Sequence, residues 1–117
     1  MDAEKIREHC LKKKLTEECM PFGEDTLVFK VAGKMFLLLP LNPSGSINIK
    51  VDPEKAVEMR EKYEEVRPGY HMNKKHWNTV RLDGRLMDAL VLKWIDESYD
   101  LVVEGLSKKV KDQIFQN

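Results

Sequence analysis

The sequence predicts one α+β domain, residues 1–117, in which an antiparallel sheet has helices packed on one side. Three observations support this. Stretches rich in β-forming residues follow one another closely between Thr26 and Val51. Apolar residues recur at helical spacing before, after and well beyond these stretches. A chain of 117 residues, 42% apolar and 34% charged, can bury one core without disulfides or metal.

The N-terminal segment from Asp2 to Lys13 is expected to be a helix. Its Ala3, Ile6 and Cys10 fall at i, i+3 and i+7, while Lys and Arg fill the other face. Leu15 to Asp25 is punctuated by proline and glycine, which favours a connector.

Three strands should follow as an antiparallel meander. Thr26–Val31 is rich in β-forming residues, and the Ala32-Gly33 pair suits a tight turn. Met35–Leu39 is apolar without interruption, which is typical of a central strand covered on both faces. In the third strand, apolar residues at 47, 49 and 51 alternate with polar ones.

A second helix should begin at Asp52-Pro53, because Asp caps free amides and Pro suits the first helical position. It should run to about Glu64 and end at Arg67-Pro68-Gly69. Asn73–His76 suits one helical turn, and Trp77–Leu82 suits a strand.

The C-terminal part should be helical. Leu90, Val91, Trp94 and Ile95 form a stripe that is repeated further on, so either one long helix or two helices broken near Asp96 are expected. Ser107 is a candidate N-cap for a final short helix.

Composition limits the function. Equal numbers of acidic and basic residues argue against a strongly basic nucleic-acid packager and a binder of anionic membranes. Cys10 and Cys19 have neither metal nor redox spacing, which favours reduced thiols, and the first residues lack the features of a signal peptide. We expect a cytoplasmic monomer without cofactor, metal site or membrane span.

One stretch concentrates basic, amide and aromatic residues. Between Arg67 and Arg85 there are five Lys or Arg and one Asp, a local charge of +4, so the remainder carries −4. Such a segment suits phosphates and bases. The competing interpretation is structural, and residue types alone favour it. Trp77 would then be a core residue, Asn73 would cap a turn, and the lysines would be solvated.

Catalytic signatures are missing from the sequence. It has no phosphate-binding glycine loop and no nucleophile elbow. His71 and His76 are five residues apart, which does not place two metal ligands on one helix face. A Cys10–His71 pair stays open as a possibility, but we expect a protein that is not an enzyme.

Several segments resemble the MmcQ/YjbR family. Residues 29–36 match its "K-V-x-G-K-x-F" hairpin, and residues 70–80 match its "h-x-N-K-x-H-W-x-x-V" motif. Matches at residues 49–54, 82–84 and 98–103 extend the resemblance over nearly the whole chain. It implies an α-β(3)-α-β(2)-α domain, described as CyaY-like or related to secretion chaperones, in small bacterial proteins commonly labelled DNA-binding.

Three functional hypotheses follow. The first is weak, salt-sensitive DNA binding by a set that combines motif positions with two arginines added from the charge argument: Arg67, Asn73, Lys74, Lys75, His76, Trp77 and Arg81. The second is a protein-interaction or adaptor module that docks a partner through the sheet or the aromatic patch. The third is a small-molecule or enzymatic role centred on His71 and His76. DNA binding requires the basic residues on one surface, whereas an enzyme requires His76 in a pocket.

Overall fold

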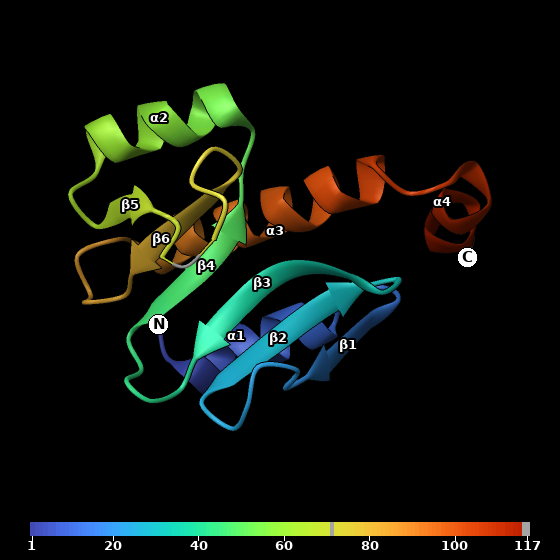
Figure 1. The fold of residues 1–117 in the computed structure, drawn as a ribbon, viewed down its shortest axis with the longest axis horizontal. Coiled ribbons are helices and arrows are strands. Elements are labelled where there is room, and N and C mark those ends of the chain that lie inside the picture. The colour runs from blue at the N-terminus through green and yellow to red at the C-terminus, as the bar shows by residue number, and fades with distance from the viewer. Residues whose placement is uncertain (71, 116–117) are drawn as a thin grey trace.

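The computed structural model describes residues 1–70 and 72–115, and it shows one sheet backed by helices (Figure 1). The sheet has six strands in the order β1-β2-β3-β4-β6-β5, and every pairing is antiparallel. The elements in chain order are α1 (Ala3–Leu11), β1 (Thr16–Cys19), β2 (Thr26–Val31), β3 (Lys34–Pro40), β4 (Ser46–Lys50), α2 (Pro53–Lys62), β5 (Val66–Pro68), β6 (Trp77–Arg81), α3 (Asp88–Glu104) and α4 (Lys108–Phe115).

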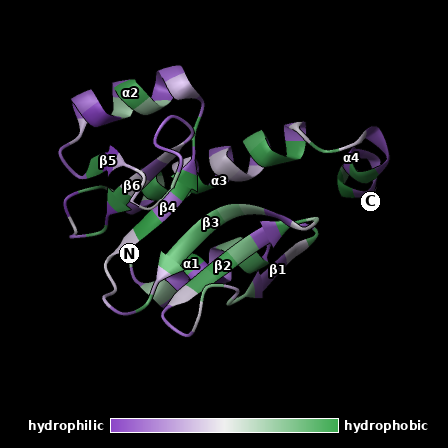
Figure 2. Ribbon diagram, in the orientation of Figure 1, coloured by the Kyte–Doolittle hydropathy of each residue, from purple (hydrophilic) through white to green (hydrophobic). Residues whose placement is uncertain are grey.

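The main core lies between one sheet face and the helices. Leu37, Ile49 and Val80 of the sheet pack in one cluster with buried residues of all four helices. β3 is hydrophobic along almost its whole length, as a strand buried on both faces should be (Figure 2). The predicted α+β class is confirmed. Among the described residues, no helix is both long and apolar enough to cross a bilayer.

The expected connector at Leu15–Asp25 is partly wrong, because its first half forms the edge strand β1. Thr16 pairs with Val31, and Cys19 pairs with Val28. Arg7 of α1 anchors this strand to the helix, because it donates two hydrogen bonds of 2.7 and 2.6 Å to the Glu18 carboxylate. Backbone pairing and this ion pair therefore order a segment that has little apolar pattern of its own.

The expected end of the second helix also needs correction. The helix stops at Lys62, and Val66–Pro68 forms the short strand β5 beside β6. Pro68 is tolerated there because an edge strand leaves one row of backbone groups unpaired. Further on, α3 is one continuous helix through Asp96, and Ser107 Oγ accepts the Val110 amide as the predicted cap of α4.

β3 and β4 separate beyond their short ladder (Figure 1). The buried Ser98 of α3 bridges them at this place. The ladder between them ends at the Leu37–Ile49 pair, and the register shift between β2 and β3 places Phe36 in a bulge. Ser98 of α3 donates to the Phe36 carbonyl at 2.5 Å and accepts the Lys50 amide at 2.9 Å. The Ser98 hydroxyl thus takes the place of a direct backbone hydrogen bond between β3 and β4.

Changing Ser98 to Ala should lower the free energy of unfolding by about 1–3 kcal/mol, since it leaves two polar backbone groups without this partner. Urea denaturation measures the loss. Ser44→Ala, in an exposed loop, is the control and should change stability little. Equal effects of the two substitutions would contradict the bridging role.

Candidate nucleic-acid interface

Two of the predicted arginines come together at the β5–β6 edge. Arg67 lies opposite Thr79 in the strand register, and Arg81 follows Thr79 by two residues. Alternation along strands therefore places Arg67 and Arg81 on the same face of this ribbon. Both line a hollow of about 420 Å³.

A third arginine, Arg60 of α2, lines the same hollow and was not among the predicted site residues. Its Nε donates to Asn78 Oδ1 at 2.7 Å, and its Nη2 donates to the Lys74 carbonyl and, at 3.4 Å, to the Trp77 carbonyl. Arg60 thus fastens α2 to β6 and to the loop that carries the lysines. A lone arginine on an amphipathic helix gives no sequence signal for such a role.

The loop between β5 and β6 is organised by Asn73. Its side-chain Oδ1 accepts the Lys75 amide at 3.0 Å, and its carbonyl accepts the amides of His76 and Trp77 at 3.2 and 3.0 Å. These bonds close the single turn that the sequence predicts at Asn73–His76. Asn73 therefore caps this turn, as the structural interpretation of the sequence expects.

Lys74 and Lys75 are exposed on this turn. The Lys74 amine donates to the Gly69 carbonyl at 3.0 Å, which places it at the end of β5. A side chain at Gly69 would come within 2.8 Å of Trp77 Cβ, so only glycine allows the loop to pack this closely. The bond from Arg60 to the Lys74 carbonyl joins the lysine turn to the arginine hollow.

Trp77 is not placed to stack on a base, because only 8% of it is exposed. It packs with Val28 and Leu38 in a second cluster, separate from the main core. The core interpretation of this residue is confirmed. The exposed aromatic ring of the stretch is Tyr70, which is 70% accessible.

His76 is half-buried, and its main chain joins the turn to β4 because its carbonyl accepts the Val51 amide at 2.8 Å. It is not among the residues that line the arginine hollow or two other hollows of the described structure. His71, the other residue of the third hypothesis, lies outside the described residues. These hollows therefore give no support to a small-molecule or enzymatic role centred on His76.

Acidic neighbours reduce the positive charge of the surface. Arg81 Nε donates to Asp83 at 2.8 Å, and this bond, with one from the Arg85 amide, holds the pKa of Asp83 below its ordinary value. Arg85 faces Glu64 and Asp83 at 3.8 and 3.9 Å, so part of the predicted local charge is internally paired. The hollow itself contains three guanidinium groups and the Glu64 carboxylate.

Other candidate chemistry has structural explanations. Cys10 is fully buried, and this burial raises the pKa of its thiol to about 12, which favours the protonated thiol over the thiolate that a Cys–His pair uses as nucleophile. His9 contacts Asp96 at 2.6 Å beside Lys13. Within residues 1–70 and 72–115, no three His, Cys, Asp or Glu side chains gather as metal ligands.

The fold and this surface define a small α+β domain with a basic edge formed by β5, β6 and the loop between them. Residues 11–101 match the model of the YjbR family, so the chain belongs to that family. Of the motif residues, 72–76 lie in the loop and 77–80 in the strand β6, and Arg60 bonds to both.

Two relatives from Escherichia coli show the extent of the similarity. The uncharacterized protein YbdF of strain O157:H7 is 40% identical over 105 residues, covering 89% of this chain and 86% of that protein. The uncharacterized protein YjbR of strain K12 is 28% identical over 117 residues, covering 99% of each.

Solved structures share the fold. The crystal structure of Deinococcus radiodurans protein DR2400 matches with a TM-score of 0.90 and 34% identity, covering 99% of this chain and 89% of that chain. A crystal structure from Pseudomonas syringae matches with a TM-score of 0.73 and 30% identity, covering 86% of this chain and 98% of that chain.

Proposed function

We propose that this protein is a non-enzymatic, cytoplasmic, monomeric DNA-binding protein that grips the phosphate backbone at the β5–β6 edge. The observation that carries the proposal is that Arg60, Arg67 and Arg81 line one hollow and that Arg60 also bonds the backbone of the lysine turn. Guanidinium groups suit phosphate oxygens because their forked donors can bind two oxygens at once.

The binding mode follows from the exposure of each group. Arg67 and Arg81, with Lys74 and Lys75, contact phosphates, and the exposed ring of Tyr70 stacks on a base where the strands are open. The exposed amide of Asn73 and the half-buried His76 reach sugar or base edges. In this proposal Trp77 supports the loop instead of contacting bases.

The test is a fluorescence-anisotropy titration with labelled single- and double-stranded DNA at about 50 and 200 mM salt. A site of three to four net phosphate contacts should lose roughly 40- to 150-fold in affinity for duplex DNA between these salt concentrations. Binding of this kind supports the proposal. No binding to either DNA at the lower salt would refute it.

A protein-interaction module is the second candidate, and the second apolar cluster favours it. Cys19, Met35 and Met72 pack only partly buried around Val28, Leu38 and Trp77. Partly covered apolar groups of this kind suit a protein partner better than a phosphate backbone. Failure of DNA binding at low salt would favour a protein-interaction function.

A further inference from the structure

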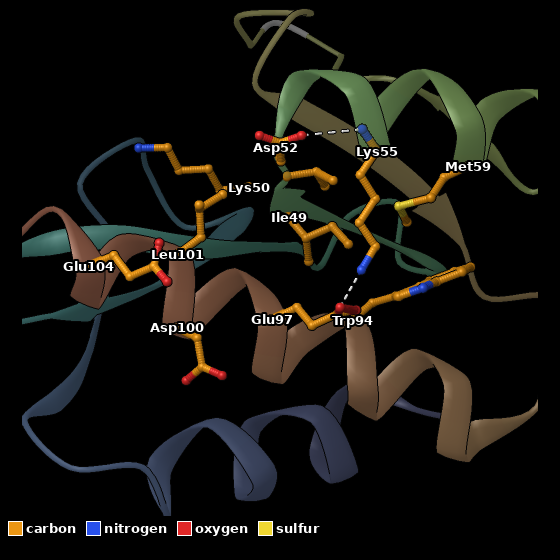
Figure 3. A pocket seen from close by; sticks show the side chains of 11 residues that line it. Ile49, Lys50, Asp52, Lys55, Met59, Trp94, Glu97, Asp100, Leu101 and Glu104 are labelled. Atoms are coloured by element: carbon orange, nitrogen blue, oxygen red, sulfur yellow. Dashed lines mark hydrogen bonds and ion pairs between the residues drawn. The ribbon is translucent and has the colours of Figure 1, made fainter. Parts of the chain in front are cut away.

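A second hollow lies on a different part of the molecule, between the end of β4, the start of α2 and one side of α3 (Figure 3). Its volume is about 210 Å³, and it shares no lining residue with the arginine hollow. The apolar part of its wall comes from Ile49, Val51, Met59, Trp94 and Leu101. This cleft therefore needs an explanation independent of the proposed function.

Glu97 of α3 lines this cleft and carries an oxygen without a hydrogen-bond partner among the described residues. Its Oε2 pairs with the amine of Lys55, which reaches from α2 toward Glu97 beside Trp94 (Figure 3). Its Oε1 is shielded from solvent and has no hydrogen-bond partner among the described residues, although 36% of the side chain is exposed. A buried carboxylate oxygen favours a donor, above all a charged one.

The charges around the cleft favour a cation over an anion. Four acidic residues line it against two lysines, a balance of −2: Asp52, Glu97, Asp100 and Glu104 against Lys50 and Lys55. Lys55 is already engaged by Glu97. A ligand that carries a carboxylate or phosphate would meet this excess of negative charge.

The apolar wall is held in place before any ligand binds. The Trp94 ring contacts the Tyr63 ring edge to face, with centroids 5.1 Å apart at 75°. Because drug-sized ligands occupy pockets of roughly 300–1,000 Å³, this smaller cleft suits a body of one ring or a short branched chain.

We propose that the cleft between α2 and α3 binds a small primary amine with an apolar body. The body packs between Met59, Leu101 and Trp94, and the ammonium donates to the Glu97 carboxylate, whose shielded Oε1 turns toward the cleft to accept it. The carboxylate then bridges two cations, the ligand at Oε1 and Lys55 at Oε2.

The test is an NMR titration of the isotope-labelled protein, following backbone amides, with three matched probes. Phenethylamine carries the charge, 2-phenylethanol is its neutral analogue, and phenylacetate carries the opposite charge. Phenethylamine should bind about tenfold or more tightly than the other two. Its shifts should concentrate at residues 49–59 and 94–104. Equal binding of amine and alcohol, or shifts centred elsewhere, would overturn the proposal.

Two variants test the role assigned to Glu97. Glu97→Gln should weaken phenethylamine binding about tenfold and leave 2-phenylethanol binding nearly unchanged, because only the charged acceptor is lost. Glu58→Gln removes one charge from an exposed position on α2 outside the cleft, and it should change neither probe. Equal amine affinities of these two variants would overturn the proposal.

Lys55→Gln should change the affinity for phenethylamine in the opposite direction. Removing the competing cation should tighten phenethylamine binding roughly three- to tenfold. If the Lys55–Glu97 pair only stabilises the fold, the same change leaves amine affinity unchanged or weakens it, and either result would contradict the bridging arrangement. The amide spectrum of each variant shows whether the fold persists.

Discussion

Reversing both lysine charges in K74E/K75E is expected to abolish DNA binding at about 50 mM salt. The five basic groups of the surface would become three basic groups beside two carboxylates, so phosphates would be repelled where they are now attracted. We expect a loss of at least about 100-fold in affinity, measured by anisotropy. Both lysines are exposed, so the fold should tolerate the change.

The matched control is K108E/K109E, which makes the same charge change at exposed positions of α4. α4 lies at the opposite end of the molecule from β5 (Figure 1). This control should keep nearly all of the affinity, because charges separated by more than a Debye length are screened. Unchanged affinity in K74E/K75E would remove the basic surface as the DNA site. An equal loss in both variants would indicate nonspecific attraction.

The sequence predicted those parts of the fold whose own residues carry a burial pattern. β2 and β3 contain runs of apolar residues and β4 alternates apolar with polar residues, because these strands lie inside the sheet, and α3 shows its buried stripe at helical spacing. β1 was missed because Thr16–Cys19 contains two glutamates and little alternation. Its strand character comes from pairing with β2, which no local pattern reveals.

The candidate site was predicted in part for a similar reason. Charge counting found Arg67 and Arg81, but only the antiparallel register of β5 and β6 shows that they share a face. Arg60 was missed because its partners, Asn78 and the carbonyls of residues 74 and 77, lie 14 to 18 positions further along the chain. Residue type also could not decide between stacking and burial for Trp77.

Changing Arg60 to Met is expected to lower the free energy of unfolding by about 2–4 kcal/mol, because bonds that join three elements are lost together. Asn78, which is 0% exposed, would keep its bond to the Ala56 carbonyl but lose the donor to its Oδ1. The Lys74 and Trp77 carbonyls would also lose the guanidinium. Urea denaturation measures the change in stability.

Arg60→Lys separates geometry from charge in this prediction. An ammonium keeps the positive charge but cannot reach Asn78 and the loop carbonyls with the same rigid fork. We expect Arg60→Lys to lose most of the stability that Arg60→Met loses, whereas Arg67→Met, at an exposed strand position, should cost little. Wild-type stability in Arg60→Lys would show that charge alone is sufficient. If Arg60→Lys loses stability as expected, the DNA affinity of the folded variant should fall as well, because the guanidinium fork holds the loop that presents Lys74 and Lys75.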